Sequence, residues 1–108
     1  MNLQKLRKFL EKSNILIEVV DSRAIDQTRL TFFEKKYKDK IMIVATKKDL
    51  VDSESIEKLK QKYPNIIFVN TKDREDINQL KQKIFEIAAK KIEKNKKASV
   101  FVFGLPNV

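Results

Sequence analysis

The chain of 108 residues contains no cysteine and no histidine, and it has only one glycine. Without cysteine it forms no disulfides and offers no thiolate metal ligands, a composition that fits a reducing cytoplasm. Without histidine as well, zinc sites, Ser-His-Asp or Cys-His triads and a histidine general base are excluded. Any chemistry must therefore use Asp, Glu, Lys, Ser, Thr, Tyr or backbone groups.

Long apolar runs are also missing. No stretch approaches the length that spans a membrane, and residues 1–12 are amphipathic and charged, unlike a signal peptide. Charge is spread throughout and 42% of the residues are hydrophobic, which is typical of a globular protein. We expect a cytoplasmic protein without membrane contact, folded as one domain over residues 1–108.

The net charge is +9, and most of the positive charge comes from lysine. Such a charge favours a polyanionic partner, such as RNA or a nucleotide. A lysine-rich solvated surface without any such partner explains the charge equally well. The charge by itself leaves both interpretations open.

Four apolar segments rich in β-branched residues predict buried strands, and segments with helical periodicity alternate with them. The strands are predicted at residues 15–20, 41–45, 66–69 and 99–103, and the helices at 2–12, 26–38, from Asp52 to Pro64, and at about 75–95. Asp52 is expected to cap its helix, with Val51 and Ile56 at the spacing of a hydrophobic staple. The predicted inward faces carry Leu30, Phe33 and Tyr37 in the second helix, Ile56, Leu59 and Tyr63 in the third, and Ile77, Leu80, Ile84, Ile87, Ala88 and Ile92 in the last.

The alternation of helices and strands predicts an α/β fold, a parallel sheet with helices on both faces. A polar cluster or loop follows each predicted strand. Because ligands of such sheets bind beyond the carboxyl ends of the strands, these clusters form the candidate site. They are Asp21-Ser22-Arg23, Thr46-Lys47-Lys48-Asp49, Asn70-Thr71-Lys72 and Gly104-Leu105-Pro106-Asn107-Val108.

Residues 46–49, Thr46-Lys47-Lys48-Asp49, resemble the guanine-specificity motif Asn/Thr-Lys-x-Asp of GTPases of the translation-factor class. A carboxylate at Asp49 can accept hydrogen bonds from both N–H groups on the guanine edge. Adenine lacks this pair of donors, and leaving the carboxylate unpaired costs on the order of 1–3 kcal/mol. The stem of Lys47 can lie across the base plane. The resemblance thus assigns guanine binding to Thr46, Lys47 and Asp49.

Residues 70–72, Asn70-Thr71-Lys72, resemble the second base-contacting loop of the same family, which is usually Ser-Ala-Lys. Asn70 stands in place of Ser and Thr71 in place of Ala. The resemblance assigns base contacts to Asn70, Thr71 and Lys72. The alternative is a plain strand end followed by a helix cap at Asp73, and the residues leave both interpretations open.

Residues 104–108, Gly104-Leu105-Pro106-Asn107-Val108, resemble the start of a phosphate-binding loop, G-x-x-x-x-G-K-[S/T]. The preceding residues 100–103 supply the strand that such a loop follows. The sequence stops before the second glycine, before the lysine that reaches the phosphates and before the Ser/Thr that holds Mg²⁺. We therefore expect this chain to be the N-terminal part of a longer GTP-binding domain.

The order of these motifs carries further information. In ordinary GTPases the phosphate loop precedes the guanine motif, whereas here it follows. This order resembles the circularly permuted GTPases of the YlqF/YawG type, which take part in ribosome assembly. Their first strand is followed by Asp-Ala-Arg, similar to Asp21-Ser22-Arg23, and their phosphate loop commonly reads Gly-x-Pro-Asn-Val-Gly-Lys-Ser. The resemblance extends over about residues 15–108.

This resemblance implies a partial P-loop GTPase domain of Rossmann-like topology with strand order 4-1-2-3. The implied cofactor is GTP or GDP, with Mg²⁺ only in the complete parent. The parent is expected to hydrolyse GTP and to act on a ribosomal subunit or ribosomal RNA. We expect this chain alone to be inactive because its phosphate loop is incomplete, so no catalytic and no metal-binding residue is assigned.

Two other expectations concern partners. Residues 100–103 would lie at an open sheet edge, where unpaired backbone groups favour self-association. The alternative function is that of a non-enzymatic, flavodoxin-like module that binds RNA through its lysine-rich last helix. RNA affinity with a steep salt dependence and no guanine preference would favour that module.

Overall fold

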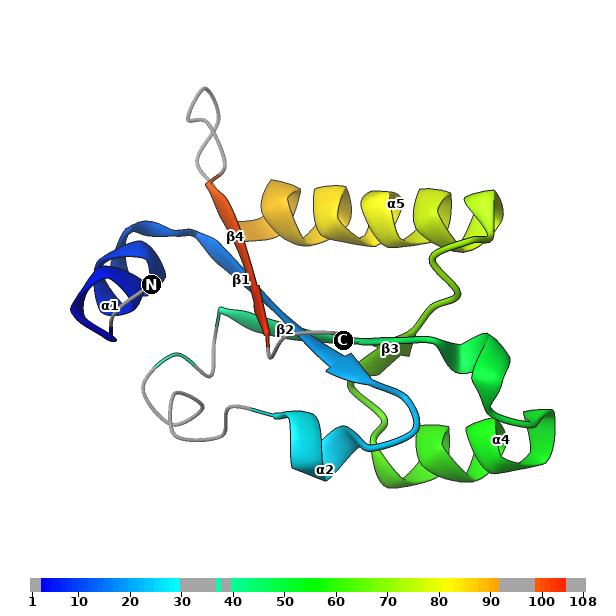
Figure 1. Cartoon of the computed structure of the whole chain (residues 1–108). Coiled ribbons are helices and arrows are strands. Elements are labelled where there is room, and N and C mark those ends of the chain that lie inside the picture. Colours follow the sequence, from blue (N-terminus) through cyan, green and yellow to red (C-terminus); the bar gives the residue numbers. More distant parts are fainter. Residues whose placement is uncertain (1–2, 30–36, 38–39, 92–98, 105–108) are drawn as a thin grey trace.

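The protein is an α/β domain built on a four-stranded, all-parallel sheet with strand order β3-β2-β1-β4 (Figure 1). The computed structural model describes residues 3–29, 37, 40–91 and 99–104. Read from the β4 edge, this strand order is the predicted order 4-1-2-3. The elements are α1 (Leu3–Lys12), β1 (Ile15–Asp21), α2 (Ile25–Thr28), β2 (Ile41–Thr46), the 3₁₀ turn η2 (Lys48–Leu50), α4 (Ser53–Lys62), β3 (Ile66–Phe68), α5 (Arg74–Lys91) and β4 (Val100–Gly104).

Strand β1 lies at the centre of the sheet and pairs with β2 on one side and β4 on the other. The register places Asp21 opposite Thr46, the last residues of β1 and β2. On the other side, Val19 of β1 lies opposite Gly104, the last residue of β4. The carboxyl ends of the strands therefore meet at one edge, as the sequence predicted.

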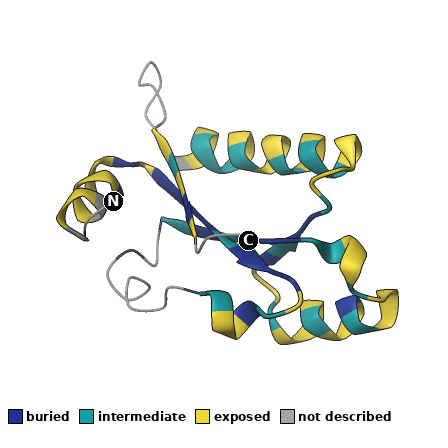
Figure 2. Ribbon diagram, in the orientation of Figure 1, coloured by how far each residue is buried: buried dark blue, intermediate teal, exposed yellow. Residues whose placement is uncertain are grey.

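Side chains of the central strands alternate between two apolar faces, because successive residues of a strand point to opposite sides. One face packs against α5, the other against α2 and α4, and Figure 1 shows these helices on opposite sides of the sheet. Burial is concentrated in the strands between them (Figure 2). The α5 side contains Ile15, Ile17, Met42, Val44 and Val69 with Leu80, Ile84, Ile87 and Ala88, and the other side contains Val20, Ile25, Ala45, Ile56, Ile66 and Phe68 with Leu59 and Tyr63.

Helix α1 packs on the α2/α4 side of the sheet, where Leu10 meets Leu16, Tyr37 and Phe103. Helix α4 begins as predicted, because Asp52 accepts hydrogen bonds from the Ser55 N–H and from the Ser55 hydroxyl, both at 2.8 Å. Such a cap satisfies one of the free N–H groups of the first turn.

The helix predicted at residues 26–38 does not run continuously. Helix α2 ends at Thr28, and Arg29 is extended, with φ −82° and ψ 145°. The Thr28 hydroxyl donates to the Ala24 carbonyl at 2.7 Å and competes with the helical pattern, while the Arg29 guanidinium lies 3.9 Å from the buried Glu18 carboxylate. Leu30, Phe33, Ile92 and the predicted helix ends at Lys38 and Asn95 lie outside the described residues.

Candidate functional site

The carboxyl edge of the sheet brings together the residues that follow β1, β2 and β3. The Val69 N–H donates to the Ala45 carbonyl at 2.8 Å, and the Lys48 N–H donates to the Val69 carbonyl at 3.2 Å. The segment 46–49 therefore lies between the end of β1 and the chain that leaves β3. Two of the predicted clusters, 46–49 and 70–72, are neighbours at this edge.

Within the segment 46–49, the side chains point into different environments. Thr46 is buried, and its hydroxyl donates to the Val20 carbonyl at 3.3 Å, so its side chain links β2 to β1. Lys47 adopts the left-handed conformation, with φ 61° and ψ 30°, and is the single non-glycine residue with positive φ in the described part of the chain. The turn that follows presents Asp49 to solvent. Within the described residues the Asp49 side chain has no hydrogen-bond or ion-pair partner.

The two lysines of this segment lie beside carboxylates on either side of it. The Lys47 ammonium lies 3.6 Å from the Asp21 carboxylate at the end of β1. The Lys48 ammonium lies 3.1 Å from the Asp76 carboxylate in the first turn of α5. Both lysine side chains are about one-third exposed, so the two ion pairs lie at a partly solvated surface.

The segment 70–72 forms a tight turn between β3 and α5. The Asn70 side chain accepts a hydrogen bond from the Lys72 N–H at 3.0 Å, and Thr71 and Lys72 are exposed. Asp73 accepts from the Glu75 N–H at 2.9 Å and so supports the start of α5. The helix-cap interpretation of Asp73 is therefore confirmed, and the turn before it lies next to the segment 46–49.

Asp76 is a residue of this site that the sequence analysis missed. Its carboxylate accepts from the Asn70 N–H at 2.8 Å and pairs with Lys48, and it thereby links the segments 46–49 and 70–72. The Asn70 N–H, against the opposing effect of burial and with help from Lys48, lowers the pKa of Asp76 below its usual value. The sequence signal was only an acidic residue in a predicted first helical turn, which many helices carry.

The cluster Asp21-Ser22-Arg23 is organised around the Asp21 carboxylate. It accepts from the Arg23 N–H at 2.8 Å and from the Arg23 guanidinium at 3.0 and 2.8 Å. These hydrogen bonds, more than the charge of Lys47, lower the pKa of Asp21 to about 2. Ser22 is buried, and its N–H donates to the Thr46 carbonyl at 3.0 Å. Asp21 is thus an ionised anchor for cations.

Gly104 ends β4 close to the backbone of β1. A Cβ atom at this position would lie 2.6 Å from the Val19 carbonyl oxygen, closer than real Cβ contacts allow. A residue with a side chain therefore does not fit here without backbone movement. Leu105, Pro106, Asn107 and Val108, the rest of the predicted phosphate-loop start, lie outside the described residues.

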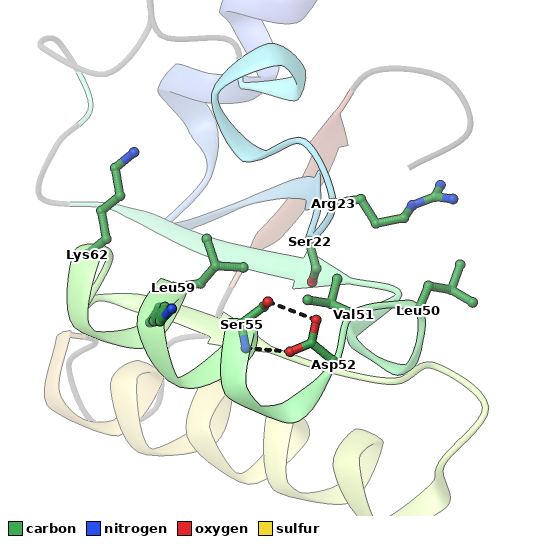
Figure 3. Close-up of a pocket in the computed structure, with 9 residues that line it drawn as sticks. Ser22, Arg23, Leu50, Val51, Asp52, Ser55, Leu59 and Lys62 are labelled. Atoms are coloured by element: carbon green, nitrogen blue, oxygen red, sulfur yellow. Dashed lines mark hydrogen bonds between the residues drawn. The ribbon is translucent and has the colours of Figure 1, made fainter.

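A cavity of about 510 Å³ lies between the end of β1 and helix α4 (Figure 3). It is lined by Ser22, Arg23, Leu50 and Val51 and by residues along α4 from the cap at Asp52 to the last residue, Lys62.

In the part of the chain that the structure describes, no three acidic side chains gather in a way that could hold a metal ion. Within the same residues, no helix is long and apolar enough to cross a membrane.

The fold and the polar carboxyl edge define a class of protein, an α/β domain with a parallel sheet and a candidate site at the strand ends. No family model matches the chain. The chain is 32% identical, over 107 residues, to an uncharacterized GTP-binding protein of Methanocaldococcus jannaschii. The alignment covers 95% of this chain and 28% of that relative, so the chain spans about a quarter of the length of the relative.

Proposed function

We propose that this chain is the guanine-recognising part of a GTP-binding protein, with the base bound between the segments 46–49 and 70–72. The observation that carries the proposal is the Asp49 carboxylate, which is exposed at the carboxyl edge and has no partner among the described residues. The relative is named as a GTP-binding protein, and its alignment covers 95% of this chain, which supports a guanine nucleotide as the ligand.

The chemistry of base selection follows from the Asp49 carboxylate. Its two oxygens can accept hydrogen bonds from the ring N–H and the exocyclic amino group of guanine, whereas adenine offers no such pair of donors. The aliphatic stem of Lys47 is oriented by the contact of its ammonium with Asp21 and can cover one face of the base. Thr46 supports the base site from the sheet, because its hydroxyl donates to the Val20 carbonyl of β1.

The phosphate side of the site rests on the resemblance to circularly permuted GTPases. Gly104 lies at the strand end where their phosphate loop begins, and its lack of a side chain suits the close approach to β1. In this proposal Mg²⁺, GTP hydrolysis and contact with a ribosomal subunit or ribosomal RNA belong to the longer protein. When bound there, Mg²⁺ would neutralise phosphate charge.

Equilibrium dialysis with labelled GDP and ADP tests the proposal. We expect the chain to prefer GDP by about tenfold or more, since unpaired carboxylate contacts cost on the order of 1–3 kcal/mol. Asp49→Ala should abolish the preference. Glu54→Ala, which removes another exposed carboxylate, from α4, should leave it intact. Equal affinity for the two nucleotides in the unsubstituted chain would refute guanine recognition.

A second candidate function is RNA binding by the outer face of α5. Lys81, Lys83 and Lys90 are exposed along this helix, and the chain carries a net charge of +9. Binding through phosphate contacts would weaken steeply with salt and would not depend on Asp49. Affinity for single-stranded RNA measured between 50 and 200 mM salt (roughly the range in which phosphate-driven binding collapses) separates it from the first proposal.

A further inference from the structure

One carboxylate oxygen of Asp76 contacts both segments of the candidate site, 46–49 and 70–72. The Asn70 N–H approaches Oδ2 at 2.8 Å and the Lys48 ammonium approaches the same oxygen at 3.1 Å. The Asp76 side chain is 13% exposed, so water competes only partly for this oxygen. A single atom in the first turn of α5 thus links two segments that belong to different βα units.

We propose that Asp76 is a positioning residue that sets the geometry between the segments 46–49 and 70–72, and thereby sets the degree of selectivity for guanine. The part about selectivity rests on the proposed function. The positioning itself is a property of the folded chain and is measurable without nucleotide. Asp76 does not contact the base in this proposal. It acts through Lys48 and Asn70.

The first turn of α5 has capping contacts that do not involve Asp76. Asp73 already accepts from the Glu75 N–H, and the Asp73 carbonyl accepts from the Ile77 N–H, so the first turn is organised without Asp76. The oxygen of Asp76 is instead directed to a loop N–H and to a lysine of another turn. This use is typical of a residue that holds a binding site in shape, where loss of preorganisation lowers affinity.

In the described part of the chain, backbone hydrogen bonds restrain only the beginning of η2 relative to the chain that leaves β3. The bond from the Lys48 N–H to the Val69 carbonyl fixes the beginning of η2 to the chain that leaves β3. Beyond it, Asp49 and the exposed residues Thr71 and Lys72 have no comparable link between the two segments among the described residues. The spacing between Asp49 and the turn 70–72 therefore depends on Asp76.

Three substitutions separate the two contacts of Asp76. Asp76→Asn keeps an oxygen for the Asn70 N–H but removes the charge that faces Lys48. Asp76→Ala removes both contacts, and Lys48→Met removes the ion pair from the other side. Asp73→Ala is the matched control, because it deletes a carboxylate that caps the same helix turn and does not contact the segment 46–49.

The first readout is amide hydrogen exchange in the absence of nucleotide. We expect Asp76→Ala to speed exchange at Asn70 and at Leu50, whose N–H donates to the Lys47 carbonyl, by about tenfold, with a smaller change at the core amides of β1. Asp73→Ala should speed exchange at Glu75 and leave Asn70 and Leu50 unchanged. Exchange at Asn70 and Leu50 that stays the same in Asp76→Ala would overturn the positioning role.

The second readout is the ratio of affinities for GDP and inosine diphosphate. Inosine lacks the exocyclic amino group, so the ratio reports how well the second hydrogen bond to Asp49 is aligned. We expect the ratio to fall about fivefold in Asp76→Asn and Lys48→Met, as is common for coupled groups in one network. Asp73→Ala should keep the ratio of the unsubstituted chain. A ratio that does not change in Asp76→Asn and Lys48→Met would overturn the selectivity role, whereas absence of GDP binding by the unsubstituted chain would refute only the proposed function.

Discussion

Among the individual side chains, Asp49 and Asp21 illustrate two different uses of a carboxylate at the same sheet edge. Asp49 is exposed and has no partner in the described part of the chain, so it is available to a ligand. Asp21 is buried and holds the Arg23 guanidinium through two hydrogen bonds. A carboxylate without a partner can accept hydrogen bonds from a ligand, while a paired one stabilises the loop that carries it.

Substituting Asp49 should change the preferred base in a predictable way. Asp49→Asn presents one acceptor and one donor where the carboxylate presents two acceptors. Xanthine carries a ring N–H donor beside a carbonyl acceptor, which matches this pattern. We expect the variant to lose affinity for GDP and gain affinity for xanthosine diphosphate, measured by competition dialysis. Unchanged selectivity in this variant would show that Asp49 does not contact the base.

Asp21 should make folding stability dependent on acid. Its pKa is lowered from 3.8 to about 2, chiefly by hydrogen bonds from Arg23. Since a lowered pKa in the folded state stabilises the protein above the unfolded value, this contribution is complete at neutral pH and disappears as the pH falls from about 4 to 2. We expect it to be on the order of 1–2 kcal/mol after solvent screening.

Urea unfolding of the chain and of Asp21→Asn measures this contribution. The stability difference between them should be largest at neutral pH and should shrink below about pH 4. A difference that remains constant down to pH 2 would show that the charge of Asp21 does not stabilise the fold.

Among the secondary-structure elements, β4 depends on the absence of a side chain at its last residue. Gly104→Ala would place a Cβ atom 2.6 Å from the Val19 carbonyl oxygen, and only backbone movement relieves that clash. We expect a loss of about 1–3 kcal/mol in the free energy of unfolding, as is usual for overpacked sites. Val102→Ala, an exposed position on the same strand, is the control and should cost under about 1 kcal/mol. Equal losses in the two variants would contradict this account of β4.

The elements that the sequence predicted best are those specified by local patterns. Runs of β-branched residues mark the strands, and Asp52 with Val51 and Ile56 marks the start of α4, because capping and periodicity act within a few residues. The interruption at Arg29 was missed, since the Arg29 guanidinium lies beside Glu18 on β1, a residue that is distant in the sequence. Long-range partners of this kind are not encoded in the local pattern.

The same limit applies to the candidate site. The placement of segments 46–49 and 70–72 at one edge follows from the parallel topology, which the alternation of elements predicted. The link through Asp76 and the left-handed conformation of Lys47 depend on how the strand ends meet in three dimensions. Neither feature has a signature in the residue types alone.

For the domain as a whole, the β4 edge of the described sheet exposes apolar side chains. Strand β4 lies at one edge, and its residues Val100 and Val102 are 42% and 57% exposed. These side chains lie on the α5 side, since Val102 is paired with Ile17 of the α5 face. An exposed apolar strand with unpaired backbone groups is a template for association.

We therefore expect the isolated chain to self-associate through β4. Sedimentation should show dimers that increase with protein concentration, and Val102→Lys should shift the equilibrium to monomer. Phe85→Lys, at an apolar residue of α5 that is 73% exposed, is the control for general loss of apolar surface and should have a smaller effect. Monomer at all concentrations would contradict this role of β4.

The most direct test of base recognition at the carboxyl edge uses nucleosides, because they carry no phosphate. Isotope-labelled chain is titrated with guanosine and with adenosine, and backbone amide shifts are followed by NMR. We predict that guanosine shifts the amides of residues 47–50 and 70–72 and that adenosine at the same concentration does not. Equal effects of the two nucleosides, or shifts confined to other parts of the chain, would contradict the proposal that Asp49 recognises guanine.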